Sequence, residues 1–217
     1  MSASSTTVGP ELFDYLAART RDEDDFLRDL KTNAEAEGIP PIWISPEQGS
    51  FLQVILKLAK VRRVVEVGTL AGYSAITMAR ALPDDGRVDT IELEPKHADF
   101  AEKWVAKSDV AGKVVVHRGS GSDVMRTLEP DSADAAFIDA DKAGYGDYLG
   151  EALRIVRVGG LILCDNAFAF GRLLDESSTD ESVQAIRDFN DRVASEPRLH
   201  GIIMPIGDGC WVGIRES

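Results

Sequence analysis

The sequence predicts an α/β fold: one doubly wound, mostly parallel sheet with helices on both faces, N-terminal helices and a closing antiparallel hairpin. Three observations lead to this prediction. Short apolar stretches alternate five times with helical segments, and repeated βα units of this kind form parallel sheets. Near the end, Gly207-Asp208-Gly209 separates two strand-like stretches, as in a hairpin. The length of 217 residues suits one domain better than two, because domains contain roughly 150 residues.

The part before the alternating segments is predicted to be mainly helical. Residues 11–37 are acidic and helix-like, with scattered apolar anchors, and the two prolines that follow favour extended backbone. The next helix is predicted to begin after Ser45, which suits an N-cap, and Gln48 three residues later completes a capping box. We therefore expect an N-terminal helical extension over residues 1–44 and the main domain over residues 45–217.

The alternating part follows in order along the chain. Runs of Val, Ile, Leu and Ala predict strands at residues 64–67, 87–93, 114–117, 133–138 and 161–164. Helices are predicted at residues 72–82, 95–110, 122–128, 145–156 and 181–194. The first of these helices is expected to stop at Pro83, the second near Gly112 and the fourth before Gly159. The hairpin strands are expected at residues 199–206 and 210–215. Right-handed crossovers then give a Rossmann-like sheet, whose ligands bind outside the carboxyl ends of the strands.

The charge argues against a protein that binds nucleic acid or a membrane surface. The chain has 24 Lys and Arg against 37 Asp and Glu, a net charge of −13 at pH 7, whereas binding phosphates needs basic residues.

Its first residues do not resemble a secretory signal, and no apolar run reaches the roughly 20 residues that span a bilayer. Cys164 and Cys210 lie in strand-like stretches, so we expect buried thiols. A soluble cytoplasmic protein is the resulting prediction.

A glycine loop follows the first predicted strand. Its spacing, from Gly68 to Gly72, is Gly-x-x-x-Gly rather than the Gly-x-Gly-x-x-Gly that holds a dinucleotide pyrophosphate. Glu66 lies within the motif and would repel a phosphate, so the loop suits a ligand with a positive charge or hydroxyl donors. Glu92 ends the second strand, where such folds bind ribose hydroxyls. Alternatively, Glu92 is a solvated charge and Glu94 caps the next helix.

Acidic and amide side chains follow the fourth and fifth strands. Asp139 comes directly after the fourth, and Asp165 and Asn166 come directly after the fifth. Neighbouring strands lie about 4.8 Å apart, so these three side chains should converge and suit Mg²⁺, Mn²⁺ or Ca²⁺ rather than zinc. Lys142 follows closely and could act as a general base toward a hydroxyl. The alternative is a solvated salt-bridged turn beside an Asx-type loop, but two such motifs at consecutive strand ends favour a functional site.

In these motifs the sequence resembles the cation-dependent class I O-methyltransferases, the caffeoyl-CoA and catechol O-methyltransferase family, which has many bacterial members. The resemblance covers residues 45–215. Its marks are residues 45–49, 66–74, 137–142, 159–160, 165–166 and 207–209.

The resemblance implies S-adenosylmethionine as cofactor and a divalent cation, most simply Mg²⁺, as the metal. The implied cofactor contacts are Glu66, Gly68, Thr69, Ser74, Glu92, Gly121 and Asp141. The implied metal ligands are Asp139, Asp165 and Asn166, and Lys142 is the implied base. Such an enzyme methylates one hydroxyl of a small aromatic vicinal diol, and its relatives are commonly homodimers. The main domain would then be the methyltransferase domain.

Two other hypotheses keep the fold and change the function. A hydroxylated uridine of tRNA could be the acceptor, although the net charge of −13 speaks against it. A non-catalytic nucleoside-binding regulator is the other, although an open metal site would be of no use to it. Trp43, Phe168 and Phe170 are candidates for the wall of an aromatic pocket, with plain packing or a dimer contact as the alternative.

Overall fold

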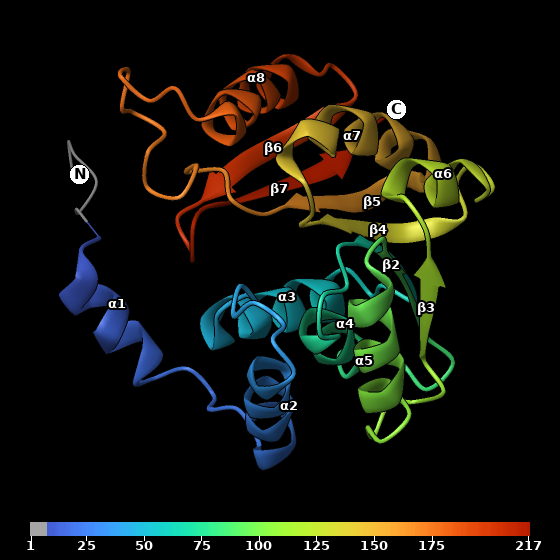
Figure 1. Cartoon of the computed structure of the whole chain (residues 1–217). Helices are drawn as coiled ribbons and strands as arrows, with labels where there is room; N and C mark the ends of the chain where they lie inside the picture. The colour runs from blue at the N-terminus through green and yellow to red at the C-terminus, as the bar shows by residue number, and fades with distance from the viewer. Residues whose placement is uncertain (1–7) are drawn as a thin grey trace.

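The computed structural model describes residues 8–217 and contains a seven-stranded sheet with helices on both faces (Figure 1). The strands are β1 (Arg63–Val67), β2 (Arg87–Glu92), β3 (Val114–Arg118), β4 (Ala133–Ile138), β5 (Val156–Cys164), β6 (Leu199–Met204) and β7 (Cys210–Arg215). Their order is β3-β2-β1-β4-β5-β7-β6. The first five strands pair in parallel, and β7 is antiparallel to both β5 and β6. The predicted fold class, a doubly wound sheet with a closing hairpin, is confirmed.

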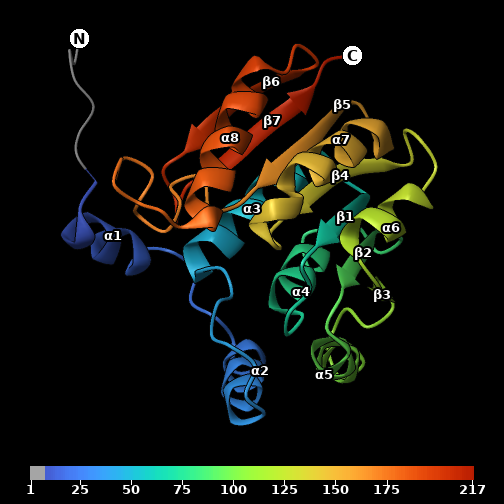
Figure 2. The same cartoon turned by 45° about the horizontal axis from the view of Figure 1, so that its top comes forward.

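Eight α-helices are described, and the last six of them divide between the two faces of the sheet (Figures 1 and 2). They are α1 (Pro10–Ala17), α2 (Asp25–Ala36), α3 (Pro46–Leu58), α4 (Tyr73–Ala79), α5 (Pro95–Val105), α6 (Gly121–Arg126), α7 (Tyr145–Ile155) and α8 (Glu181–Ser195), with a 3₁₀ turn η1 (Lys142–Gly144) before α7. The helices α3 to α5 cover one face and α6 to α8 the other. None of these helices is both long enough and apolar enough to cross a membrane.

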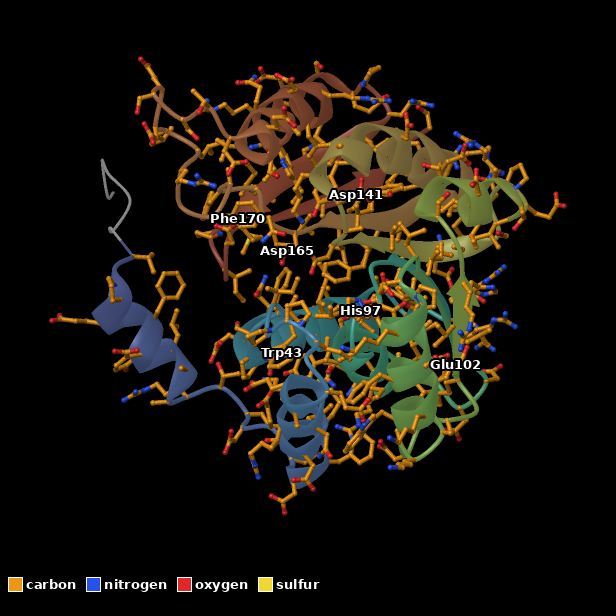
Figure 3. The ribbon with its side chains drawn as sticks, viewed as in Figure 1. Trp43, His97, Glu102, Asp141, Asp165 and Phe170 are labelled. Carbon is orange, nitrogen blue, oxygen red and sulfur yellow. The ribbon has the colours of Figure 1, made fainter. Side chains whose placement is uncertain are left out.

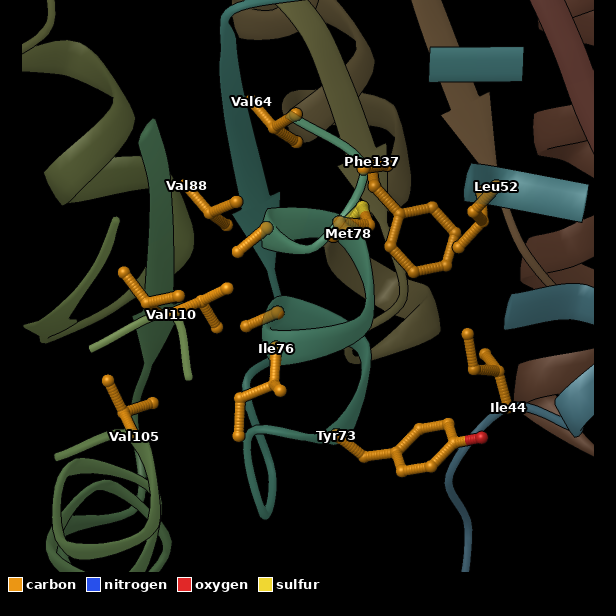
Figure 4. Close-up of a cluster of buried hydrophobic side chains, with 14 of the residues drawn as sticks. Ile44, Leu52, Val64, Tyr73, Ile76, Met78, Val88, Val105, Val110 and Phe137 are labelled. Carbon is orange, nitrogen blue, oxygen red and sulfur yellow. The ribbon is translucent and has the colours of Figure 1, made fainter. Parts of the chain in front are cut away.

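The core consists of two large apolar clusters, one on each face of the sheet. Successive strand residues enter opposite clusters: Val64 and Phe137 pack toward α3 and α4, whereas Val65 and Ile138 pack toward α7. Figure 4 shows the first cluster, in which Phe137 of β4 lies close to Leu52 of α3. Burial on both faces explains why the central strands are continuous apolar runs.

Several predicted boundaries are wrong. The helical segment predicted at 11–37 is two helices, because the carboxylate of Asp24 accepts a hydrogen bond from the Leu27 N–H and starts α2 anew. The helix predicted to reach residue 110 ends at Val105, where Ser108 bonds the local backbone instead. The helix predicted at 72–82 is only α4, and β5 begins at Val156, with a register irregularity where it pairs with the start of β4.

Other local predictions hold. The capping box is complete, because Ser45 Oγ accepts from the Gln48 N–H while Gln48 Oε1 accepts from the Ser45 N–H. Cys164 and Cys210 are buried free thiols.

Candidate active site

The winding of the sheet reverses between β1 and β4, and the two strands approach each other closely there. Gly68, at the end of β1, has a φ of 103°, and a Cβ at this position would overlap the backbone oxygen of Asp139. Gly72 has a φ of 85° at the N-terminus of α4 and packs against Ala101 of α5. Both positions need glycine, because the backbone there is left-handed and a side chain would meet neighbouring atoms. The two glycines lie at the edge where doubly wound sheets bind ligands.

A cavity of about 640 Å³ opens at this edge. Nine of the predicted site residues line it: Gly68, Thr69, Ser74, Glu92, Gly121, Asp139, Asp141, Lys142 and Asn166. The other two, Glu66 and Asp165, are 0% and 5% exposed and lie outside its lining. Trp43 and His97 face Asp141 and Phe170 across the opening (Figure 3). The residues singled out from the sequence are thus brought to one place.

Glu92 is a buried carboxylate held by backbone. It is 8% exposed, and its two oxygens accept hydrogen bonds from the Leu70 N–H at 2.8 Å and the Glu94 N–H at 2.9 Å. Glu92 is therefore not a solvated charge, although Glu94 does cap α5 as the alternative interpretation expected. Leu70 has a φ of 49°, a conformation that is unusual for leucine and brings its N–H to the carboxylate.

Glu66 is the most unusual carboxylate in the site. Within residues 8–217, neither of its oxygens has a hydrogen-bond partner, and burial raises its pKa to about 8. An orphaned buried carboxylate beside a glycine loop suits a ligand that brings a cationic donor to it. The amino group of S-adenosylmethionine is such a donor, so this residue fits the cofactor.

The raised pKa of Glu66 makes stability without cofactor depend on pH. The folded chain keeps this carboxyl protonated up to about pH 8, whereas the unfolded chain releases the proton near 4.5, so stability should fall as pH rises between these values. Glu66→Gln should remove this slope and exceed the original chain at pH 8 by roughly 2–4 kcal/mol. It should also weaken S-adenosylhomocysteine binding by about 10–100-fold, because a charge-assisted hydrogen bond is lost.

Thermal melts from pH 5 to 9 and titration calorimetry test this prediction. Glu129→Gln is the matched control, because Glu129 is exposed and the same change there should alter neither quantity. If the melting temperature of Glu66→Gln changed with pH in the same way as that of the unchanged chain, the raised pKa of Glu66 would be contradicted.

The ends of β4 and β5 bring the remaining polar residues together. Ile138 and Cys164 are register partners in the parallel pair, so Asp139 and Asp165, which follow them, lie at the same edge. Lys142 Nζ donates to Asn166 Oδ1 at 2.6 Å, to Tyr145 Oη at 2.6 Å and to Asp139 Oδ1 at 3.3 Å. The ammonium thus lies among the oxygens that the sequence singled out as metal ligands.

The donor set is chemically suited to a hard cation. Burial raises the pKa of both Asp139 and Asp165, and the neighbouring Asp139 charge raises that of Asp165 further, whereas Lys142 counteracts both shifts. Two crowded carboxylates and an amide oxygen fit Mg²⁺ or a similar ion, whose charge would relieve this repulsion. Among the described residues, no group of three or more His, Cys, Asp or Glu side chains is placed to hold a metal ion. The set described here has only two carboxylates, Asp139 and Asp165, and its third oxygen comes from the Asn166 amide.

Some site residues are not evident in the sequence. Tyr148 Oη donates to Asp141 Oδ1 at 2.6 Å while Asp141 Oδ2 accepts from the Gly144 N–H, so both Asp141 oxygens already have partners. Tyr145 lies under Lys142, and His97 lines the cavity. No sequence pattern marks these side chains, because helix packing alone brings them to the site.

The aromatic residues divide between two environments. Trp43 and Phe170 line the cavity, as expected of a pocket wall. Phe168 does not line it and packs instead on Gly209 of the hairpin turn, where a Cβ would come within 2.8 Å of its ring.

Comparison with known proteins gives consistent matches over most of the chain. A family model described as O-methyltransferase matches residues 17–216. The catechol O-methyltransferase of Niastella koreensis is 41% identical over 198 residues, which are 89% of this chain and 87% of that relative. The catechol O-methyltransferase of Mycobacterium tuberculosis is 34% identical over 205 residues, 94% of this chain and 93% of that one.

Solved structures agree with these relatives. The O-methyltransferase of Bacillus cereus, in complex with SAH, superposes with a TM-score of 0.85 at 33% identity, covering 94% of this chain and 96% of that one. The O-methyltransferase TomG of Streptomyces achromogenes, in complex with SAM, gives a TM-score of 0.84 at 30% identity, with 95% and 96% covered.

Proposed function

Because the chain belongs to the O-methyltransferase family and is an S-adenosylmethionine-dependent enzyme, we propose that it methylates one hydroxyl of a small aromatic vicinal diol with the help of a divalent cation. The observation that carries this proposal is the convergence of Asp139, Asn166 and Lys142 at one end of the cavity. Hard oxygen ligands beside an amine suit the chelation and deprotonation of a diol. The catechol O-methyltransferase relatives support this class of acceptor.

The residues of the glycine loop and of β2 are proposed to bind the cofactor. Glu66 would meet its amino group, Glu92 its ribose hydroxyls, and Gly68, Thr69 and Ser74 its methionine portion. Gly121 and Asp141 would border the adenosine. Gly68 and Gly121 line the cavity, and a Cβ at either position would overlap the chain's own atoms, those of Asp139 at Gly68 and those of Val67 and Tyr148 at Gly121.

The other end of the cavity is proposed to hold the acceptor. Asp139, Asp165 and Asn166 would hold the cation, which would make a diol hydroxyl more acidic, while the cofactor would supply the methyl group. Lys142 Nζ, in its neutral amine form, would accept the hydroxyl proton. Trp43 and Phe170 would stack on the aromatic ring and exclude water, so the main contribution of the chain would be positioning.

A methyl-transfer assay with paired acceptors tests the proposal. Catechol should be methylated in Mg²⁺, whereas phenol, which has only one hydroxyl and cannot chelate, should react at least about 100-fold more slowly. Excess EDTA should abolish transfer to catechol, and added Mg²⁺ or Mn²⁺ should restore it. Full activity in EDTA would contradict the metal, and preferential transfer to tRNA would contradict the small-molecule acceptor.

A further inference from the structure

Two side chains outside the cavity lining contact Asp165 and Asn166 directly. Gln48 comes from the first turn of α3, and Asp208 comes from the turn between β6 and β7. We propose that Gln48 and Asp208 are positioning residues that fix Asp165 and Asn166 in the orientations needed to bind the cation. This inference rests on the proposed function, and it adds two residues that do not line the cavity.

Gln48 controls which oxygen of Asp165 is available. Gln48 Oε1 accepts from the Ser45 N–H at 3.0 Å, and this bond fixes the orientation of the amide, so Nε2 must point the other way. Nε2 donates to Asp165 Oδ1 at 2.8 Å. Gln48 is 7% exposed, and a Cβ on Gly207 would overlap its amide, so this side chain has little room to rotate. Asp165 is thereby left with Oδ2 as its available ligand atom.

Asp208 controls which end of the Asn166 amide faces the cavity. Asp208 Oδ2 accepts from Asn166 Nδ2 at 3.2 Å, so Asn166 Oδ1 faces Lys142 Nζ, 2.6 Å away. The same carboxylate also accepts from the Phe170 N–H at 2.8 Å and the Gly171 N–H at 3.2 Å. It therefore ties the loop after β5 to the hairpin.

The loop needs such a tie because its backbone is unusual. Asn166, Ala169 and Phe170 have φ values of 62°, 53° and 58°, in the left-handed region that non-glycine residues seldom adopt. Without Asp208, only the contact with Lys142 Nζ would hold the Asn166 amide, and its NH₂ group, which repels a cation, could turn toward the cavity more readily. Because Gly207 packs on Gln48, the hairpin turn and the first turn of α3 act as one unit behind the two ligands.

Mn²⁺ binding to the full chain in the presence of S-adenosylhomocysteine tests the proposal. Gln48→Met, which changes no charge, and Asp208→Ala should each weaken Mn²⁺ binding, measured by electron paramagnetic resonance, by about 10–100-fold. Affinity for S-adenosylhomocysteine should stay within about twofold, and saturating Mn²⁺ should restore most of kcat. Asp208→Asn, of nearly the same size, provides a second variant should the alanine variant fail to fold.

Ser45→Ala is the matched control. It removes the other half of the capping box, so it should lower the melting temperature, but it leaves Gln48 Nε2 on Asp165 and should not change Mn²⁺ affinity. If the unchanged chain binds Mn²⁺ and the Gln48 and Asp208 variants bind it equally well, positioning is overturned while the proposed function stands. If the unchanged chain binds no Mn²⁺ and works in EDTA, both are overturned.

Discussion

Asp165→Ala should lower the rate of methyl transfer by roughly 10³-fold or more, because a cation that contributes several kcal/mol to the transition state would lose a carboxylate ligand. Affinity for S-adenosylhomocysteine should remain within a few-fold, since Asp165 does not line the cavity around the glycine loop. The fold should survive as well. Burial raises the pKa of Asp165, so its ionised form opposes folding, and relief of that penalty should offset the loss of the hydrogen bond from Gln48 Nε2.

Single-turnover rates and calorimetry with S-adenosylhomocysteine separate these effects. Asp188→Ala is the matched control, because Asp188 is an exposed aspartate on α8 whose carboxylate, among the described residues, accepts a hydrogen bond only from Gln184. A rate for Asp165→Ala within tenfold of the unchanged chain would contradict its role in the reaction. Loss of cofactor binding together with activity would indicate a structural role instead.

The fold and much of the candidate site are predictable from sequence because their signals are local. A strand that is buried on both faces must be an apolar run. The residue that follows it lies at the carboxyl edge of the sheet, and this placement depends only on the local sequence. For this reason the order of residues along the chain is enough to predict that Asp139 and Asp165 lie side by side, as the register of β4 and β5 confirms. Gly68 carries a local signal too, because only glycine tolerates its left-handed backbone and its contact with the end of β4.

The parts that sequence reasoning missed depend on contacts between distant segments. Gln48 has a correct local interpretation as a capping residue, and nothing near it in the chain reveals that its second amide atom bonds Asp165, 117 residues away. Asp208 likewise resembles an ordinary turn residue until the loop after β5 folds onto it. The break before α2 is hidden for a different reason: an acidic, helix-like segment continues on both sides of an internal cap at Asp24.

Lys142→Met should lower the rate by about 10²–10⁴-fold, the usual range for losing a general base. The side chain is 10% exposed, and its amine lies 3.3 Å from Asp139 Oδ1 at the end of the cavity proposed to hold the acceptor, so neither bulk water nor another described amine can replace it easily. A base role and a purely electrostatic role predict different outcomes for Lys142→Arg. The guanidinium keeps the positive charge but stays protonated, so it can stabilise an anion and cannot accept a proton.

If Lys142 is the base, Lys142→Arg should be nearly as slow as Lys142→Met, and added methylamine should raise the rate of Lys142→Met. If the charge alone matters, Lys142→Arg should keep most of the rate. The pH–rate profile gives a second criterion, since the ascending limb due to the base should disappear in both variants. Lys103→Met, at an exposed lysine of α5 that pairs with Glu37, is the matched control and should behave as the unchanged chain. An active arginine variant with an unaltered profile would assign the proton to solvent and leave Lys142 as an electrostatic partner of Asp139 and Asn166.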